Sequence, residues 1–321
     1  MKVNKMKPSG IHLLLTYKCN ASCDHCFLSC GPKREGLITL EETRKYVEDA
    51  AAVPYVDHFF IEGGEPFLYP GLLKDMVAEI SGRGFWLGSL TNGFWASSDS
   101  RARRLLKPLT DAGLRSLGVS TDAWHTQFVP VERAERAILI AGELGLNANL
   151  MVCKGGPEDN AFQEKLKDAG HDFYASGLIC RGRAATNSEC RVNKHKWQKL
   201  KVCPDTFGGD SRVHLGPGGQ IHLCQGLLLG RDARVEPLSE IFAGFKVEEH
   251  PVCAALSAGG PAGLARLAME YGFVPEEKYA DGCQLCFEAR RHLLPCFPYL
   301  IGPAEMYEDS ITVPGIRAAG N

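Results

Sequence analysis

Apolar runs of strand length alternate with helical stretches from residue 11 to about residue 180. Short apolar runs separated by amphipathic helices are typical of parallel strands joined by crossovers. The pattern predicts strands at 11–16, 56–62, 85–91, 114–120, 146–152 and 172–179. It predicts helices near 39–52, 70–82, 100–112, 130–144 and 158–169.

Two of these helices begin with a recognisable local signal. Thr39 and Glu42 form a capping box, and Pro130 stands at the start of the fourth helix, where proline is favoured. Six strands fall short of the eight in a closed barrel, so we expect an α/β fold built as an open, partial (β/α)6 TIM-like barrel. Its site should then lie at the C-terminal ends of the strands.

Beyond residue 185 the pattern changes to glycines, prolines and widely spaced cysteines. The segment GPGG between RVHL and QIHL predicts a β-hairpin, and a helical stretch follows at about 260–271. We therefore expect a barrel at 10–185, a small module of a hairpin plus a helix at 186–300, and a C-terminal tail at 301–321.

Composition narrows the class of protein. The net charge is −2 and both signs are interspersed, so we expect no nucleic-acid partner and no anionic membrane surface. No apolar run is long enough to span a bilayer, and the first one stops at Tyr17, so it indicates a strand and not a signal peptide. Thirteen cysteines without a secretion signal favour metal ligation in a reducing cytoplasm over disulfides.

Three cysteines, Cys19, Cys23 and Cys26, follow the first predicted strand at Cys-x3-Cys-x2-Cys spacing. Soft thiolates prefer iron-sulfur clusters or zinc, and such close spacing suits one loop wrapped around one cluster. With three protein ligands, a four-iron cluster keeps one iron open, and an open metal position can bind a substrate or cofactor.

Two other metal sites are consistent with the same segment. A four-cysteine ferredoxin loop would add Cys30, although the first gap is one residue longer than in that motif and Gly31 precedes Pro32. A zinc knuckle would take His25 or Cys30 as its fourth ligand.

The cysteine motif resembles the signature of the radical S-adenosylmethionine (SAM) enzymes. In that family the open iron chelates the amino and carboxylate groups of SAM, and an electron from the reduced cluster gives methionine and a 5'-deoxyadenosyl radical, which takes a hydrogen atom from substrate. The resemblance covers roughly residues 10 to 300. It implies a [4Fe-4S] cluster, SAM, and a reductant such as flavodoxin or ferredoxin.

Further motifs match the family at the ends of later strands. Gly63, Gly64, Glu65 and Pro66 resemble its GGE motif, which holds the SAM amino group. Polar residues at the ends of the third and fourth strands are expected to reach the ribose, and one histidine nearby is a weak catalytic candidate: Asn92, Ser120, Asp122 and His125.

A second set of cysteines stands in the C-terminal part: Cys203, Cys224, Cys283 and Cys286. By number alone, four cysteines suit structural zinc equally well. The order of a cysteine, Gly219 and a cysteine on a hairpin, followed by Cys-x2-Cys, resembles the "twitch" module of radical SAM enzymes. The larger SPASM module needs more cysteines, so the resemblance implies one auxiliary [4Fe-4S] cluster and not two.

Within the family, the phrase CNASCDHC, the NGFW segment and the cysteine hairpin most resemble the radical SAM peptide epimerases. Their hydrogen-donating cysteine directly follows the second hairpin ligand, where this chain has Gln225. Other cysteines that could substitute are Cys153, Cys180, Cys190, Cys253 and Cys296.

Three functions follow as hypotheses. The first is modification of a ribosomally synthesised peptide at a C–H bond, with the peptide held by the barrel mouth and the auxiliary module and with net two-electron oxidation favoured. The second is a twitch-type dehydrogenase of a small aminocyclitol or sugar. The third is a non-catalytic iron-sulfur electron carrier, which would not cleave SAM.

Overall fold

The computed structural model describes residues 6–155, 159–187, 194–205, 207 and 212–308. Its main sheet has nine strands in the order β10-β9-β8-β1-β2-β3-β4-β5-β6. The first six strands are parallel to their neighbours, so the predicted partial (β/α)6 barrel is confirmed. These strands are β1 Gly10–Thr16, β2 His58–Gly63, β3 Trp86–Thr91, β4 Ser116–Ser120, β5 Asn147–Lys154 and β6 Phe173–Gly177.

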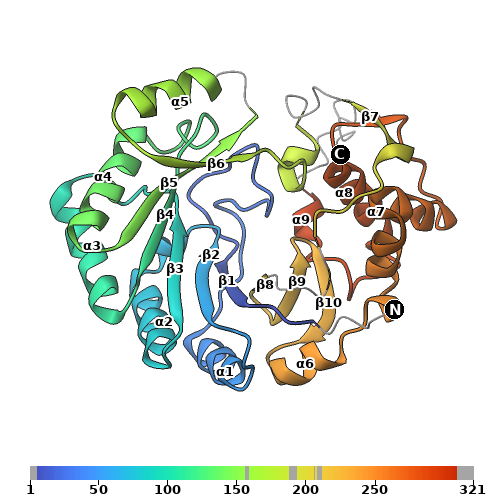
Figure 1. The fold of residues 1–321 in the computed structure, drawn as a ribbon, viewed down its shortest axis with the longest axis horizontal. Coiled ribbons are helices and arrows are strands. Elements are labelled where there is room, and N and C mark those ends of the chain that lie inside the picture. The colour runs from blue at the N-terminus through green and yellow to red at the C-terminus, as the bar shows by residue number, and fades with distance from the viewer. Residues whose placement is uncertain (1–5, 156–158, 188–193, 206, 208–211, 309–321) are drawn as a thin grey trace, which may run out of the picture.

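The five predicted crossover helices are confirmed and cover the outside of the curved sheet (Figure 1). The capping box at Thr39 is formed, because its side chain accepts from the Glu42 backbone and the Glu42 side chain accepts in return. Pro130 is the N-cap residue of the fourth helix. The helices are α1 Leu40–Ala51, α2 Pro70–Gly82, α3 Asp99–Ala112, α4 Val131–Glu143 and α5 Asp159–Asp168.

The predicted C-terminal hairpin is present, but it also extends the barrel sheet. Strands β8 Arg212–Leu215 and β9 Gln220–Cys224 are antiparallel, and β10 Leu227–Asp232 pairs with β9. The sequence did not indicate that β8 pairs in parallel with β1. The remaining elements are α6 Leu238–Gly244, α7 Pro251–Glu270, α8 Gly282–Leu293, α9 Glu305–Glu308, and a small sheet of β7 His195–Lys196 and β11 Lys278–Tyr279.

Helix α7 begins well before the expected residue 260, because His250 caps it by accepting from the Cys253 backbone. It is the one helix in the described part of the chain with the length and apolarity of a membrane span. Non-helical torsions at Gly259 and Gly260 break it into two segments, and each is shorter than a bilayer requires. Half of its apolar window is buried inside the protein.

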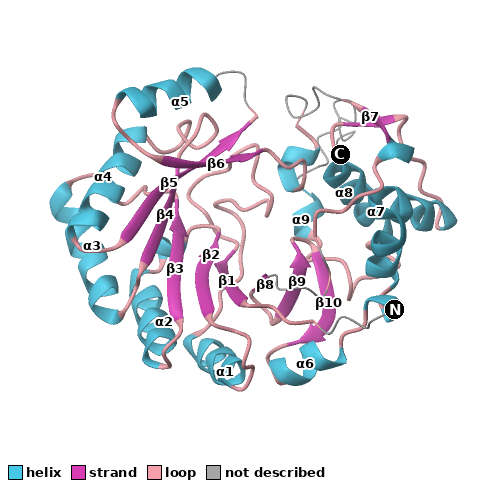
Figure 2. Ribbon diagram, viewed as in Figure 1, coloured by secondary structure: helices cyan, strands magenta, loops and turns pink. Residues whose placement is uncertain are grey.

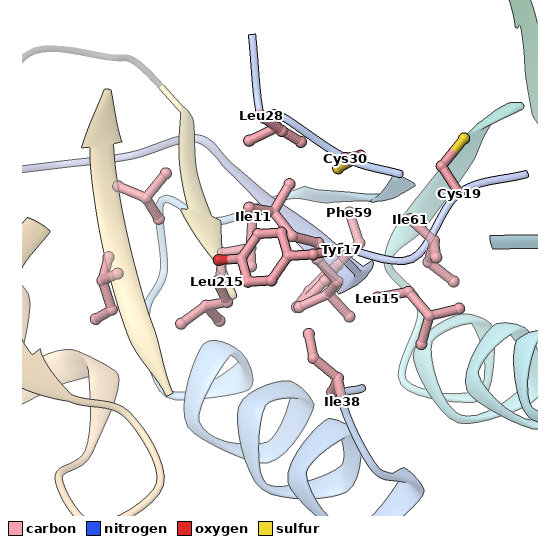
Figure 3. Packing of buried hydrophobic residues seen from close by; sticks show 14 of the residues in the cluster. Ile11, Leu15, Tyr17, Cys19, Leu28, Cys30, Ile38, Phe59, Ile61 and Leu215 are labelled. Carbon is pink, nitrogen blue, oxygen red and sulfur yellow. The ribbon is translucent and has the colours of Figure 1, made fainter. Parts of the chain in front are cut away.

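Strand β1 is buried along its whole length, and the main hydrophobic core packs against β1 and β2. Alternate residues of β1 and β2, including Ile11, Leu15, Phe59 and Ile61, belong to the main core, into which Ile38 also packs (Figure 3). The other residues of these strands face the barrel interior. At the end of the sheet, Figure 2 shows the long loop that leaves β1 and crosses the top of the barrel. Residues 301–308, expected as part of a tail, include α9, whose Met306 and Tyr307 are buried.

Candidate active site

The loop after β1 carries Cys19, Cys23 and Cys26 and is fastened at both ends. The Cys19 N–H donates to the Gly31 carbonyl over 3.1 Å, which closes the loop on itself. The Arg183 side chain donates to the carbonyl of Cys23 over 2.9 Å and to that of Cys30 over 2.7 Å. The Arg183 backbone N–H donates to the Cys26 carbonyl over 3.1 Å. The cysteine loop is therefore held from outside itself, by the segment that follows β6.

Gly182 allows the segment after β6 to lie close to the cysteine loop. Its φ is +58°, and a Cβ at this position would lie 2.5 Å from the Cys26 carbonyl oxygen. Any larger residue would push the segment away from the cysteine loop. Sequence reasoning left Arg183 and Gly182 unassigned; the available signal was the arginine-rich CRGR segment at the C-terminal edge of the barrel.

Two sulfur atoms of the loop accept N–H groups. The Ala21 N–H lies 3.4 Å from Cys19 Sγ, and the Cys30 N–H lies 3.4 Å from Cys26 Sγ. A hydrogen bond from the Cys30 thiol lowers the pKa of Cys26 to about 5, whereas burial raises the pKa of Cys19 to about 12. Soft sulfur ligands with N–H groups directed at them are what an iron-sulfur cluster requires, so the donor set fits this group.

Cys30 is the least exposed of the four cysteines in this segment, at 2%. Its hydrogen bond to Cys26 and its burial keep its pKa well above the usual value. Figure 3 shows its side chain next to Leu28, whereas the Cys19 sulfur points away from the packed aliphatic side chains. In this arrangement Cys30 is a neutral thiol that donates to Cys26.

Gly63 and Gly64 place the end of β2 against the start of the cysteine loop. The Gly64 N–H donates to the Thr16 carbonyl over 2.6 Å, and the Glu65 N–H donates to the Lys18 carbonyl over 2.9 Å. A Cβ on Gly63 would lie 2.5 Å from the Thr16 oxygen, and one on Gly64 would lie 2.1 Å from the Lys18 oxygen. The two glycines are thus needed for a backbone contact.

The Glu65 carboxylate is fully buried and accepts three hydrogen bonds. They come from the Phe67 N–H at 3.0 Å, the Thr91 hydroxyl at 2.8 Å and the Asn92 N–H at 2.7 Å. Burial raises the pKa of Glu65 to about 7, although the three hydrogen bonds act in the opposite direction. Pro66 follows directly and opens the short 3-10 helix Pro66–Leu68.

The structure brings Asn92 and Asp122 to the same edge of the barrel. The Asn92 side chain donates to the Asn20 side chain over 2.9 Å and lies 3.7 Å from Cys19 Sγ. Ser120 ends β4, two residues before Asp122. One oxygen of Asp122 accepts from the backbone and the ring of His125, and the other accepts from the Cys153 N–H.

His25, Asp122 and His125 form one cluster next to the cysteine loop. His25 Nε2 lies 3.9 Å from Asp122 Oδ2, and the rings of His25 and His125 are 4.7 Å apart. Burial alone would raise the pKa of Asp122, but the charge and hydrogen bond of His125 hold it at about 2. Burial lowers the pKa of His25 to about 4, whereas the Asp122 carboxylate raises that of His125 against its burial.

The second cysteine set lines one cavity between β9, α8 and the segment before β8. Cys203, Cys224, Cys283 and Cys286 all border it, together with two arginines. Arg181 Nη1 lies 3.0 Å from Cys224 Sγ, and the Arg290 side chain, 2% exposed, donates to the Gln225 carbonyl. Four thiols beside one buried and one half-buried guanidinium group suit an anionic cluster. Sequence reasoning had not assigned these two arginines.

The other cysteines occupy different surroundings. Cys253 is fully buried near this second set, and its proximity to Cys286 and Cys203 adds to the effect of burial in raising its pKa. The Cys153 backbone N–H donates to Asp122 Oδ2 over 3.1 Å. Cys180 is buried, and Cys296 is exposed. Cys190 lies outside the described residues.

Comparisons with known proteins agree with this geometry. The model of the radical SAM superfamily matches residues 13–169. YydG of Bacillus subtilis, named for peptide biosynthesis, is 26% identical over 224 residues, which cover 67% of this chain and 68% of YydG. The mycofactocin maturase MftC of Mycobacterium tuberculosis is 22% identical over 291 residues, 85% of this chain and 74% of MftC.

Solved structures share the fold. Native anSMEcpe with bound AdoMet superposes with a TM-score of 0.53 at 12% identity, covering 90% of this chain and 98% of that one. The same protein with AdoMet and the Cp18Cys peptide gives a TM-score of 0.51 at 13% identity, covering 91% and 98%. The radical SAM superfamily model thus matches the part of the chain that carries the first cysteine set and strands β1 to β5.

Proposed function

We propose that this protein cleaves SAM reductively at a [4Fe-4S] cluster held by Cys19, Cys23 and Cys26, and that it takes a hydrogen atom from a C–H bond of a peptide. The observation that carries the proposal is the fastening of the cysteine loop to Gly64 and Glu65 by two backbone hydrogen bonds. When bound, the cluster and SAM would supply a 5'-deoxyadenosyl radical, as the resemblance to radical SAM enzymes implies.

Glu65 is suited to hold the SAM ammonium group. A carboxylate offers about four lone-pair positions, and three of those on Glu65 are taken by Phe67, Thr91 and Asn92. One position is left for a charged donor, and the site around it excludes water because Glu65 is fully buried. The three existing bonds fix the carboxylate before SAM arrives.

A peptide substrate is supported by the relatives. YydG is named for peptide biosynthesis and aligns with two thirds of this chain, and anSMEcpe, which has the same fold, has been solved with a peptide. For this chain, we infer that the peptide lies in the barrel mouth between the cysteine loop and the second cysteine set. The described cysteines form no disulfides, which suits a reducing cytoplasm with flavodoxin or ferredoxin as the electron donor.

The net reaction we propose is a two-electron oxidation. Gln225 follows Cys224, and its amide N–H bonds are too strong to release a hydrogen atom readily. The thiols of the second set suit a second four-iron cluster, whose chemistry would be that of an electron acceptor. Arg181 and Arg290 would stabilise the added negative charge there. The product would then be two hydrogens lighter than the substrate, and SAM would be consumed stoichiometrically.

The first experiment is SAM cleavage by anaerobically reconstituted protein with dithionite. We expect 5'-deoxyadenosine and methionine from the wild type and from Cys30→Ala, and neither product from Cys26→Ala. A wild type that keeps its iron without cleaving SAM would instead be an electron carrier. If only Cys30→Ala cleaves SAM, the fourth thiol closes the cluster as in a ferredoxin loop.

The second experiment follows the product in deuterated water by mass spectrometry, with any small open reading frame found beside the gene supplying the first peptide to be tested. A product lighter by two hydrogens supports oxidation. A product of unchanged composition that carries one solvent deuteron would show epimerisation. Loss of that deuteron in a single-cysteine variant would then identify the donor, with Cys153 tested first because it lies beside Asp122.

A further inference from the structure

Three buried side chains with metal-ligating atoms meet across the neighbouring strands β8, β1 and β2. They are His12 on β1, Glu62 on β2 and His214 on β8. The ligand atoms of all three lie within 4.8 Å of one another, and each residue is less than 10% exposed. None of the three belongs to either cysteine set. The sheet itself assembles this triad, because His12 and His214 are paired in the parallel register of β1 and β8.

The distances within the triad match a coordination shell. His12 Nδ1 and His214 Nε2 each lie 3.1 Å from Glu62 Oε1. A tetrahedral ion with ligand bonds of about 2.0–2.1 Å places neighbouring ligand atoms roughly 3.3 Å apart. The same separations also fit hydrogen bonds, so distance alone does not decide between an ion and a proton.

Gln225 is a fourth polar group beside the triad. Its amide lies 3.4 Å from His214 Nε2, the same ring atom that contacts Glu62. With its oxygen turned to this atom, the amide can accept from a protonated ring or ligate an ion together with Glu62. His214 Nδ1, moreover, has no hydrogen-bond partner in the described structure, although the residue is 4% exposed. Hydrogen bonding therefore leaves this group incompletely satisfied.

A cation would satisfy His12 Nδ1, His214 Nε2 and Glu62 Oε1 together, while His214 Nδ1 faces away from it. Both ring nitrogens and Glu62 Oε1 would direct lone pairs at it, and a half-turn of the Gln225 amide would present its oxygen as a fourth ligand.

We propose that His12, Glu62 and His214, with Gln225, bind a divalent transition-metal ion such as Zn²⁺ or Fe²⁺. Two imidazoles and a carboxylate are the ligands these ions prefer over Mg²⁺ or Ca²⁺. A cavity bordered by Gln225, Cys224 and Arg181 also borders His214 of the triad. The site does not depend on SAM chemistry, and its occupancy is measurable without SAM.

Cobalt(II) is the probe. Protein with its iron-sulfur clusters reconstituted is stripped of loosely bound metal with a chelator and titrated anaerobically with Co²⁺. We expect about one Co²⁺ per chain with weak d–d bands and no intense thiolate-to-cobalt charge transfer, because none of the ligands is sulfur. Zn²⁺ should displace it and raise the melting temperature, since an ion that binds only the folded chain stabilises it.

Four variants and one control locate the site. His12→Ala and His214→Ala should abolish this Co²⁺ binding, Glu62→Gln should weaken it at least tenfold, and Gln225→Glu should strengthen it by adding a charged ligand. His58→Ala, which removes another histidine of β2 near His12, should bind as the wild type does. Iron content equal to that of the wild type shows that a variant is folded.

Three results would overturn the proposal. The first is a wild type that binds no Co²⁺ after stripping. The second is binding that survives both His12→Ala and His214→Ala. The third is a spectrum whose charge-transfer bands account for all the bound cobalt, which would place the ion at the cysteines.

Discussion

Arg183 Nε donates to the carbonyl oxygen of Cys23 over 2.9 Å, although 160 residues separate them in the chain. The same guanidinium reaches the Cys30 carbonyl, so one side chain bridges two parts of the cysteine loop. A planar fork of donors makes such paired contacts, whereas a lysine ammonium cannot reproduce their geometry. Arg183 is thus a positioning residue for the three thiols.

Replacing Arg183 by lysine should loosen the cysteine loop. Two side-chain hydrogen bonds of about 1 kcal/mol each are lost, so iron should leave the first cluster roughly thirtyfold faster in the presence of a chelator. The measurement is the rate of iron release, with the exposed Arg104→Lys as the control. Equal rates in the two variants would show that the loop holds its shape without Arg183.

Replacing Glu65 by glutamine should weaken SAM binding roughly tenfold to a hundredfold, since a charge-assisted hydrogen bond contributes about 1.5–3 kcal/mol. Both clusters should remain, as judged by iron content, and the exposed Glu132→Gln serves as the control. SAM affinity equal to that of the control would mean that Gly63, Gly64 and Glu65 act only in backbone packing.

The affinity for SAM should also depend on pH through Glu65. Burial raises the pKa of this carboxyl to about 7, so it gains a proton as the pH falls through 7 and loses the charge that faces the ammonium group. Binding to the wild type should therefore weaken below pH 7, and the ratio of wild-type to Glu65→Gln affinity should shrink there. A ratio that does not change between about pH 6 and pH 8 would contradict this role.

Iron content tests the two-cluster assignment. Reconstituted wild type should hold about eight irons per chain, and the triple variant Cys19→Ala, Cys23→Ala, Cys26→Ala about four. The second set should be independent because its own thiols and arginines border a separate cavity. Zinc at the second set, or loss of nearly all iron from the triple variant, would refute the assignment.

Arg181→Gln should lower the reduction potential of one cluster by tens of millivolts. The guanidinium lies 3.0 Å from Cys224 Sγ, and removing its positive charge disfavours the more negative, reduced form. Redox titration followed by electron paramagnetic resonance separates the two clusters. Arg212→Gln, an exposed arginine of a neighbouring cavity, is the matched control. Identical potentials in both variants would show that Arg181 has no electrostatic role.

The sequence predicted the parts of the fold that depend on local order. The strands and helices up to α5 follow from periodicity, and the capping box at Thr39 from four adjacent residues. Pairing of β8 with β1 had no such signal, because the two strands are about two hundred residues apart and each is a short apolar run. Packing of the whole sheet decides which distant strands pair, so no fixed spacing in the sequence indicates the pairing.

The same distinction between local and long-range signals applies to the candidate site. Close spacing made Cys19, Cys23 and Cys26 candidates for one cluster, which stays a prediction. His12 stands within an apolar run, Glu62 at the end of a second strand and His214 in a hairpin, and only the fold brings them together. The hydrogen bonds of Arg183 could not be predicted from the sequence either, because its partners are backbone carbonyls, which every residue has.

The pairing of β8 with β1 has one more consequence. Strand β1, with the sequence GIHLLLT, pairs with β2 along one edge and with β8 along the other. Without β8, the second edge would have no neighbour. In a chain shortened to end near residue 185, this edge would present free N–H and C=O groups along an apolar strand, which is a template for pairing with another copy. The C-terminal half thus prevents self-association of the barrel by covering this strand edge. It would do so even if its cysteines held no metal.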